Sequence, residues 1–220
     1  MTTQEDTSLE PLSDQRRKWL QTAADTFHAS LDRAAVQWLL GPRRGLTKEQ
    51  VVSNRIGLVP SDCPGFEKFA GYLSIPFFAA DGHVTSIRFR RPDWVSEAGP
   101  KYLNIDGERS RVYGVASVLG PWPEAHIAEG EFDSIILRDA FGCAVGYPGA
   151  TFWEPHHRVF FEGFQKVYIH GDGDEAGRKF VHEMSNRLRN AVPVYYPTGQ
   201  DATSVYVDGG ADALRRLIPE

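Results

Sequence analysis

Two aspartates that follow a short apolar run are the residues best suited to chemistry in this sequence. The segment KVYIHGDGDEAGRKF, residues 166–180, passes from a strand-like stretch into Gly171-Asp172-Gly173-Asp174 and then into a helical pattern. Such a turn lies where open α/β sheets bind ligands. Two Asp one residue apart, flanked by glycines, can direct their oxygens at one hard cation such as Mg²⁺. A simpler interpretation stays open: a polar turn in which Asp174 only caps the helix.

Length, charge and composition bound the class of protein. The chain has 220 residues, enough for one large domain or two small ones, and 41% of them are hydrophobic. No apolar run approaches the roughly 20 residues that cross a bilayer, so we expect no membrane partner and a cytoplasmic location. Two distant cysteines, Cys63 and Cys143, exclude a disulfide framework and a four-cysteine zinc ribbon, so no zinc is expected. The net charge of −5 argues against nucleic acid covering the whole surface, but leaves room for a local basic surface.

The pattern of the first quarter of the chain predicts helices, which we expect to have a structural role in packing and no chemical role. Residues 1–11 lack periodicity and are expected to be disordered. Apolar spacing predicts a helix over 13–28 and a second over 31–40, capped by Ser30. The pattern Thr47-Lys48-Glu49-Gln50 is typical of a capping box that opens a third, short helix.

A hairpin with a basic face follows. Strands are expected over 73–79 and 83–90, joined at Asp81-Gly82, with Arg88 and Arg90 on one face of the return strand. Residues 83–112 carry a net charge of +2, while the rest of the chain carries −7. This segment is either a solvated hairpin face or a surface for phosphates.

Gly120-Pro121-Trp122-Pro123 is interpreted as a connection between two subdomains. Beyond it, the pattern alternates between strands and helices. This alternation predicts a four-stranded parallel sheet with right-handed crossovers. The expected strands are 126–129, 143–146, 167–170 and 192–196, and the expected helices are 132–141, 155–164, the segment from 175 to about 188, and 208–218, with a loop over 197–203.

Acidic residues recur where these strands end. A parallel sheet brings its carboxyl ends to one rim, so acids after different strands should converge there. Such acids repel one another unless cations neutralise them, which favours a metal site. The alternative is a set of scattered, solvated acids at loop ends. The residues concerned are Glu129, Asp133, Asp172, Asp174 and Asp201.

Several of these motifs resemble a known family. EGEFD at 129–133 and DGDEAG at 172–177 are similar to the two signature motifs of the Toprim fold. PKYLN at 100–104 and VYG at 112–114 resemble motifs of the basic half of bacterial-type DNA primases, and 45–47 and 56–60 fit its opening. The resemblance covers about 30–220. It implies an α/β fold: a tail and helix over 1–29, a smaller mixed α/β basic subdomain over 30–120, and a Toprim catalytic domain over 121–220.

The resemblance also implies an activity: synthesis of an RNA primer on single-stranded DNA, using ribonucleoside triphosphates and two Mg²⁺ or Mn²⁺ ions. Glu129, Asp172 and Asp174 would be catalytic. The metal ligands would be Glu129, Asp133, Asp172, Asp174 and Asp201. The contacts to nucleotide or DNA would come from Arg88, Arg90, Lys101, Asn104, Arg109 and Arg111.

The sequence departs from the family in two places. Thr203 stands where the family has a second Asp, which predicts a weaker second metal site. The family's lysine before the Tyr-Gly pair is missing, and Arg109 or Arg111 would replace it. A zinc ribbon or a helicase segment would have to come from a separate protein. The rival interpretations are a Toprim nuclease and a non-catalytic DNA-binding replisome subunit.

Overall fold

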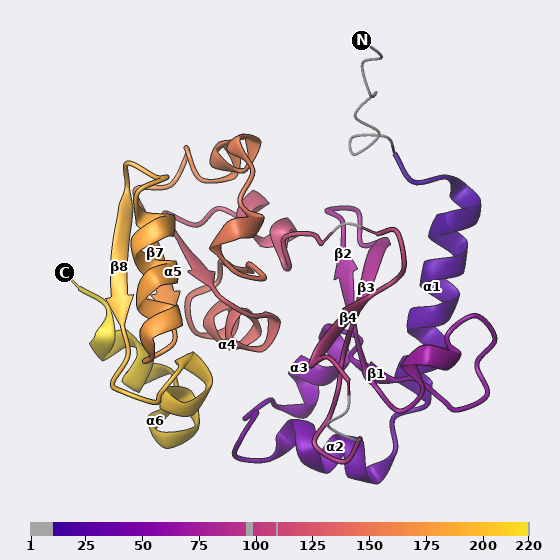
Figure 1. Ribbon diagram of the computed structural model, residues 1–220. Coiled ribbons are helices and arrows are strands. Elements are labelled where there is room, and N and C mark those ends of the chain that lie inside the picture. Colours follow the sequence, from indigo (N-terminus) through magenta and orange to yellow (C-terminus); the bar gives the residue numbers. More distant parts are fainter. Residues whose placement is uncertain (1–10, 96–98, 109, 220) are drawn as a thin grey trace.

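Two four-stranded sheets, one in each half of the chain, define the architecture (Figure 1). The computed structural model describes residues 11–95, 99–108 and 110–219, so Arg109 and all but the last residue of the predicted tail over 1–11 lie outside the described residues. Within these ranges, no helix combines the length and the hydrophobicity that crossing a membrane requires.

The N-terminal half is an antiparallel sheet with helices packed around it. The sheet has the order β1-β2-β3-β4, and the β2–β3 pair confirms the predicted hairpin. Its two outer strands are only two and three residues long, and the sequence analysis did not assign them. The elements are α1 (Asp14–Ala29), α2 (Arg33–Leu40), α3 (Lys48–Ser53), β1 (Gly57–Leu58), a 3₁₀ turn (Glu67–Phe69), β2 (Leu73–Phe78), β3 (Val84–Arg90) and β4 (Tyr102–Asn104).

Side-chain caps fix where these helices begin. Thr47 and Gln50 form the predicted capping box of α3. The prediction that Ser30 caps α2 is wrong, because Ser30 ends α1 instead, and Asp32 accepts a bond of 2.7 Å from the Ala35 backbone N–H. An aspartate at the helix N-cap satisfies an otherwise unpaired donor and suits the positive end of the helix dipole.

The C-terminal half is a parallel sheet flanked by helices, as predicted. Its strand order is β6-β5-β7-β8, and all three pairs are parallel. The elements are a 3₁₀ turn (Val115–Leu119), β5 (Glu124–Ala128), α4 (Glu131–Phe141), β6 (Ala144–Gly146), two 3₁₀ turns (Ala150–Phe152 and Pro155–Phe160), β7 (Lys166–Gly171), α5 (Glu175–Ser185), β8 (Ala191–Tyr195) and α6 (Ala202–Leu217).

Two predicted helices differ from the structure. The helix expected over 155–164 is a 3₁₀ turn that ends at Phe160. The last helix begins at 202 rather than 208, because Asp201 caps it by accepting a bond of 2.7 Å from the Ser204 backbone N–H. Its helical dihedral angles are interrupted at Gly209 and Gly210, which hid the first turns from a search for helical periodicity.

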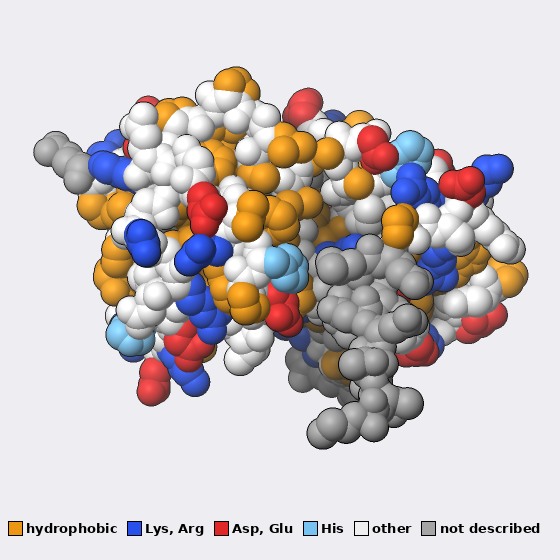
Figure 2. Space-filling model, turned by 90° about the horizontal axis from the view of Figure 1, so that it is seen from above, with side chains coloured by type: hydrophobic (Ala, Val, Ile, Leu, Met, Phe, Trp, Pro, Cys, Tyr) orange, Lys and Arg blue, Asp and Glu red, His pale blue; other side chains and the backbone are white. Residues whose placement is uncertain are grey.

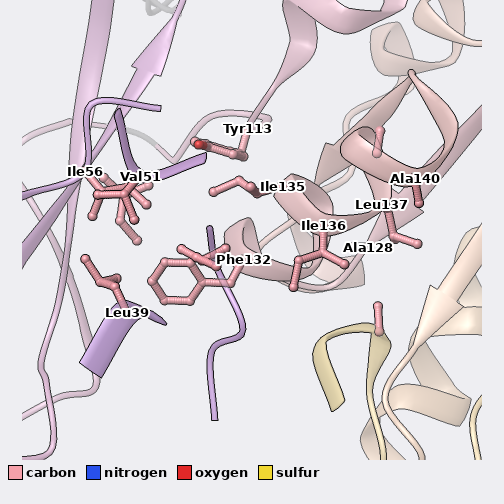
Figure 3. Packing of buried hydrophobic residues seen from close by; sticks show 14 of the residues in the cluster. Leu39, Val51, Ile56, Tyr113, Ala128, Phe132, Ile135, Ile136, Leu137 and Ala140 are labelled. Carbon is pink, nitrogen blue, oxygen red and sulfur yellow. The ribbon is translucent and has the colours of Figure 1, made fainter. Parts of the chain in front are cut away.

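One buried hydrophobic cluster joins the two halves. Leu39, Val51 and Ile56 of the N-terminal half lie in it together with Phe132 and Ile135 of α4 (Figure 3). All five side chains are at most 5% exposed. The two halves on either side of the predicted boundary at 120/121 therefore bury apolar surface against each other. This shared packing fixes their relative position.

Candidate active site

Three aspartates from three different segments come together at the carboxyl end of the parallel sheet. Asp133, Asp172 and Asp201 each place a carboxylate oxygen within 4.8 Å of the other two. The strand register explains this convergence. Gly171, the residue before Asp172, pairs with Tyr195 at the end of β8, so the loops that follow β7 and β8 leave the sheet side by side.

Backbone hydrogen bonds hold these two loops together. The Gly173 N–H donates to the Gln200 carbonyl at 2.7 Å, and the Gly199 N–H donates to the Gly173 carbonyl at 3.0 Å. A Cβ at Gly173 would lie 1.9 Å from the Pro197 carbonyl oxygen, so a larger residue cannot occupy this position without moving the loops apart. The glycine between the two aspartates is thus a packing requirement of the site.

The five predicted acids lie close enough for their negative charges to act on one another. Burial, followed by the charges of Asp133, Glu129, Asp201 and Asp174, raises the pKa of Asp172 to about 7. Burial and then Asp174 and Asp133 raise the pKa of Glu129. Gathering carboxylates in this way is unfavourable until cations neutralise them.

Thr203 fixes the position of Asp133. The Thr203 backbone N–H and hydroxyl both donate to Asp133 Oδ1, at 3.0 and 2.7 Å. Burial and then the charge of Asp201 raise the pKa of Asp133, while these two hydrogen bonds lower it. The residue that replaces the family's second Asp therefore supports a neighbouring carboxylate, and the contact ties α4 to α6.

Asp174 and Asp201 both cap helices. Asp174 Oδ1 accepts a bond of 2.7 Å from the Gly177 backbone N–H, so the simpler interpretation of Asp174 as an N-cap holds in the structure. Asp201 does the same for α6 with its Oδ1. A single oxygen makes each cap, so capping and cation binding are compatible at both residues.

Two cationic side chains of the N-terminal half, Lys101 and Arg44, face the acids, and Arg90 lies next to them but is only 3% exposed. Burial, then Arg90 and Arg44, lowers the pKa of Lys101, while Asp172 and Asp133 raise it, so the lysine lies close to both groups of charges. The Arg44 and Arg90 guanidinium carbons lie 4.5 and 5.5 Å from the centre of the Trp38 ring.

The sequence analysis missed Arg44. It lies in the loop between α2 and α3, and tertiary packing alone brings that loop to the site. At the adjacent Gly45, where φ is +59°, a Cβ would lie 2.4 Å from Val207 Cγ2 on α6. A single Gly-Leu-Thr motif gave no indication of this contact.

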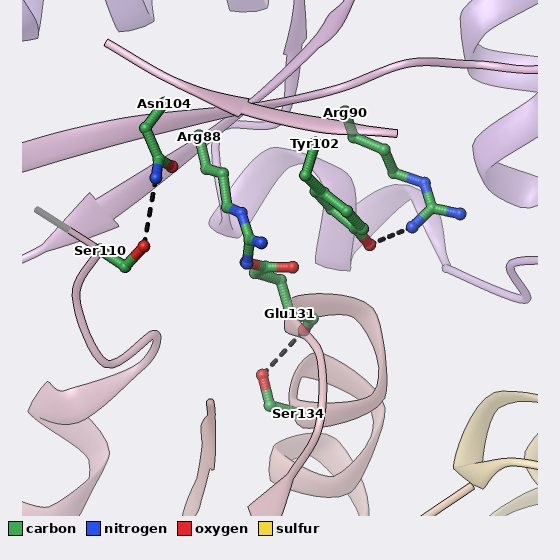
Figure 4. Close-up of polar contacts among 7 residues, drawn as sticks. All are labelled: Arg88, Arg90, Tyr102, Asn104, Ser110, Glu131 and Ser134. Atoms are coloured by element: carbon green, nitrogen blue, oxygen red, sulfur yellow. Dashed lines mark hydrogen bonds and ion pairs between the residues drawn. The ribbon is translucent and has the colours of Figure 1, made fainter. Parts of the chain in front are cut away.

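Arg88, predicted to contact phosphates, is paired within the protein. Its Nη1 lies 2.5 Å from Glu131 Oε1 at the start of α4, and the Glu131 side chain is 3% exposed (Figure 4). Arg90 donates to the Tyr102 hydroxyl, so the Tyr102 ring lies between the two arginines. Asn104 Nδ2 donates to Ser110 Oγ at 3.1 Å.

Arg111, the remaining predicted basic residue among those that the structure describes, lies elsewhere. Arg111 lines a pocket at the turn of the β2–β3 hairpin, together with Ala79, Asp81 and His83. On the face seen from above, charges of both signs are interspersed among the described residues (Figure 2). The basic surface next to the acids is therefore local, in keeping with the negative net charge.

The donor set suits a hard divalent cation. Carboxylate oxygens are the ligands that Mg²⁺ and Mn²⁺ prefer, and the gathered oxygens come from Asp133 on α4 and from Asp172 and Asp201 in two hydrogen-bonded loops. Neighbouring carboxylates repel the charged form of Asp172 and raise its pKa. A bound divalent cation would offset this repulsion, so the site favours cation binding.

The fold and the gathered acids together match the arrangement of bacterial primase cores with a Toprim domain, and no family model matches the chain. The chain belongs to the family of the gene 57 protein of Mycobacterium phage D29. The two are 35% identical over 154 residues, which is 68% of this chain and 99% of the phage protein.

Longer primases are related to the chain over part of their length. The DNA primase of Aquifex aeolicus is 29% identical over 163 residues, which cover 68% of this chain and 32% of that protein. The crystal structure of the zinc-binding and RNA polymerase domains of the A. aeolicus primase covers 95% of this chain and 62% of its own, with a TM-score of 0.77 and 23% identity. A DnaG primase catalytic domain bound to ssDNA covers 94% of this chain with a TM-score of 0.63 and 20% identity. These structural likenesses establish the fold.

Proposed function

We propose that the chain catalyses RNA primer synthesis on single-stranded DNA. The observation that carries this proposal is the meeting of two opposite charge groups. Five acids share one rim, and Lys101 and Arg44 face them from the other half of the molecule, with the buried Arg90 next to these two cations. A nucleotidyl transfer needs both, because a triphosphate is bound by cations and the carboxylates hold the metal ions.

The carboxylates of Asp133, Asp172 and Asp201 would hold the divalent ions, with Glu129 and Asp174 adding negative charge beside them. When bound, these ions would supply charge neutralisation for the attacking and leaving oxygens. The protein keeps this donor set in place through the Thr203 bonds to Asp133 and the bonds between the 173 and 199–200 loops.

Glu129 is the acid best suited to take up a proton. It follows β5 directly and lies outside the group of three carboxylates whose oxygens gather most closely among the described residues. Its raised pKa makes it a stronger base than an ordinary glutamate. In the proposed reaction the primer 3′-hydroxyl attacks the α-phosphorus, its proton passes to Glu129, and the bond to pyrophosphate breaks.

Lys101 and Arg44 would bind the triphosphate and the strand, and Arg90, which is buried, would add positive charge from beneath this surface. The guanidinium groups lie against the rings of Trp38 and Phe132, which orients them at little entropic cost. Asn104 lies on β4, opposite Arg88 of β3, and would add a neutral donor to this surface. Arg88 would act indirectly, through its pair with Glu131.

Ribonucleotide incorporation on single-stranded DNA tests the proposal. Asp172→Asn should abolish incorporation with Mg²⁺ or Mn²⁺ while the far-UV circular dichroism stays that of the unaltered chain. Asp212→Asn is the matched control, since Asp212 is an exposed acid that pairs with Arg215 on α6. Shortening of the DNA instead of its copying would indicate a nuclease. Metal binding with no product of either kind would indicate a non-catalytic subunit.

A further inference from the structure

Trp94 exposes an aromatic surface that a folded protein would ordinarily bury. Its side chain is 45% exposed, and it lies between β3 and β4, beside the basic surface. A single exposed tryptophan is common by itself, but an exposed indole next to cations offers a flat apolar face on which a base can stack.

An aromatic row connects Trp94 to the acidic rim. Its ring centre lies 5.9 Å from that of Trp38, edge to face, and Trp38 lies 6.3 Å from Phe132 in the same manner. Phe132 directly precedes Asp133 on α4. A base stacked on Trp94 would therefore lie at the outer end of a row whose inner end borders the metal ligands.

Positive charge accompanies this row. The guanidinium groups of Arg44 and Arg90 lie over the ring of Trp38, next to Trp94. The nearby acid, Asp93, is engaged: its Oδ2 accepts from Trp38 Nε1 at 2.8 Å and pairs with Arg43 at 3.5 Å. The region thus presents an aromatic face beside the partly exposed Arg44, with positive charge added by the buried Arg90, and an aromatic face next to cations is the combination that binds single-stranded nucleic acid.

We infer that Trp94 stacks on a base of the bound single-stranded DNA and guides the strand toward the acidic rim. The inference deepens the proposed function and rests on it for the identity of the strand. Trp122 is the comparison: an exposed tryptophan to which we assign no stacking role. It is 42% exposed, but its ring packs on the backbone of Gly120 and Gly142, at the far end of α4 from Asp133.

Two oligonucleotides distinguish base stacking on Trp94 from phosphate binding by cations. One is an oligothymidylate of about 12 nucleotides. The other is an abasic strand of the same length, which keeps the phosphates and lacks the bases. Fluorescence anisotropy would measure the affinity of each for the full chain. Trp94→Ala should weaken oligothymidylate binding about five-fold or more and leave binding of the abasic strand unchanged. Trp94→Tyr should restore most of the affinity, and Trp122→Ala should bind both strands like the unaltered chain.

The slope of the affinity against salt concentration should be the same in Trp94→Ala as in the unaltered chain, because the indole neutralises no phosphate. Equal losses for both strands, or no loss for either, would overturn the inference. So would quenching of Trp94 fluorescence by a ribonucleoside triphosphate but not by the oligonucleotide.

These measurements are independent of turnover. If Asp172→Asn abolishes primer synthesis and Trp94→Ala binds DNA normally, stacking is refuted and the proposed function stands. If the chain makes no primer and Trp94→Ala still loses affinity only for the strand with bases, the stacking site stands and the proposed function falls. In an active chain, Trp94→Ala should raise the KM for template and leave kcat at saturating template unchanged.

Discussion

Asp172 bears the electrostatic cost of gathering five acids on one rim. Burial and four neighbouring carboxylates raise its pKa to about 7, far above the value of an aspartate in an unfolded chain. At a pH between the pKa of Asp172 in the unfolded chain and its pKa in the folded chain, the folded state binds more protons than the unfolded state. The metal-free chain should therefore lose stability as the pH rises towards 7.

Thermal unfolding at two pH values tests this cost. Saturating Mg²⁺ should raise the Tm more at pH 8 than at pH 6, because protons compete with the ion for Asp172 at the lower pH. Asp172→Asn should stabilise the metal-free chain at pH 8 by about 1 kcal/mol or more, a figure reduced for partial exposure of the carboxylate. A Mg²⁺ effect of equal size at both pH values would show that Asp172 is already ionised at pH 6.

The hydroxyl of Thr203 should matter through Asp133 alone. Thr203→Val removes a bond of 2.7 Å to that carboxylate and leaves the backbone bond of 3.0 Å in place. A hydrogen bond to a charged group contributes about 1.5–3 kcal/mol, so Mn²⁺ affinity should fall about ten-fold in a calorimetric titration. Thr203→Ser keeps the donor and should bind like the unaltered chain. Equal affinities for all three proteins would contradict the role given to this hydroxyl.

At the scale of elements, the Arg88–Glu131 pair joins β3 to α4. Glu131 is buried, and one of its oxygens lacks a hydrogen-bond partner within the described structure, so its negative charge depends on Arg88. Removing one partner of a buried pair costs about 3–5 kcal/mol, because the other charge is left uncompensated. Arg88→Ala should therefore destabilise the chain far more than Arg88→Met combined with Glu131→Gln.

A double-mutant cycle in denaturant measures this coupling. The exposed pair Arg158–Glu162 is the control, since an exposed pair of this spacing contributes about 0.3–0.5 kcal/mol. If Arg88→Ala cost no more than Arg158→Ala, the pair would not hold the two sheets together, and Arg88 would be available to phosphates as the sequence analysis had it.

The sequence predicted the elements that local patterns determine. The hairpin, the four parallel strands and the acids that follow them were readable, because side-chain alternation and strand-end placement depend on short segments. What it missed depends on tertiary contacts: Arg44 reaches the site only because Gly45 packs on α6, and Arg88 turns inward only because Glu131 lies opposite. The start of α6 was missed because two glycines interrupt its pattern.

At the scale of the whole molecule, the shared cluster makes the two halves depend on each other. Leu39 and Ile135 are fully or almost fully buried in it, one from each half. The site needs this dependence, because the cations come from one half and the acids from the other. We expect a single cooperative unfolding transition rather than two, since the apolar surface between the halves would be exposed if either unfolded alone.

Single-tryptophan variants test cooperativity directly. One variant would keep Trp19, which stacks on Phe66 in the N-terminal half, and the other Trp153, which stacks on Tyr147 in the C-terminal half. Leu20→Ala removes packing only from a buried cluster whose members all lie in the N-terminal half, and it should cost about 2–5 kcal/mol. In a cooperative molecule the denaturation midpoint reported by Trp153 must fall together with that of Trp19. If Trp19 alone responded, the halves would be independent domains divided near 120/121, and the opposing charges of the site would be held together by the bound nucleotide rather than by the fold.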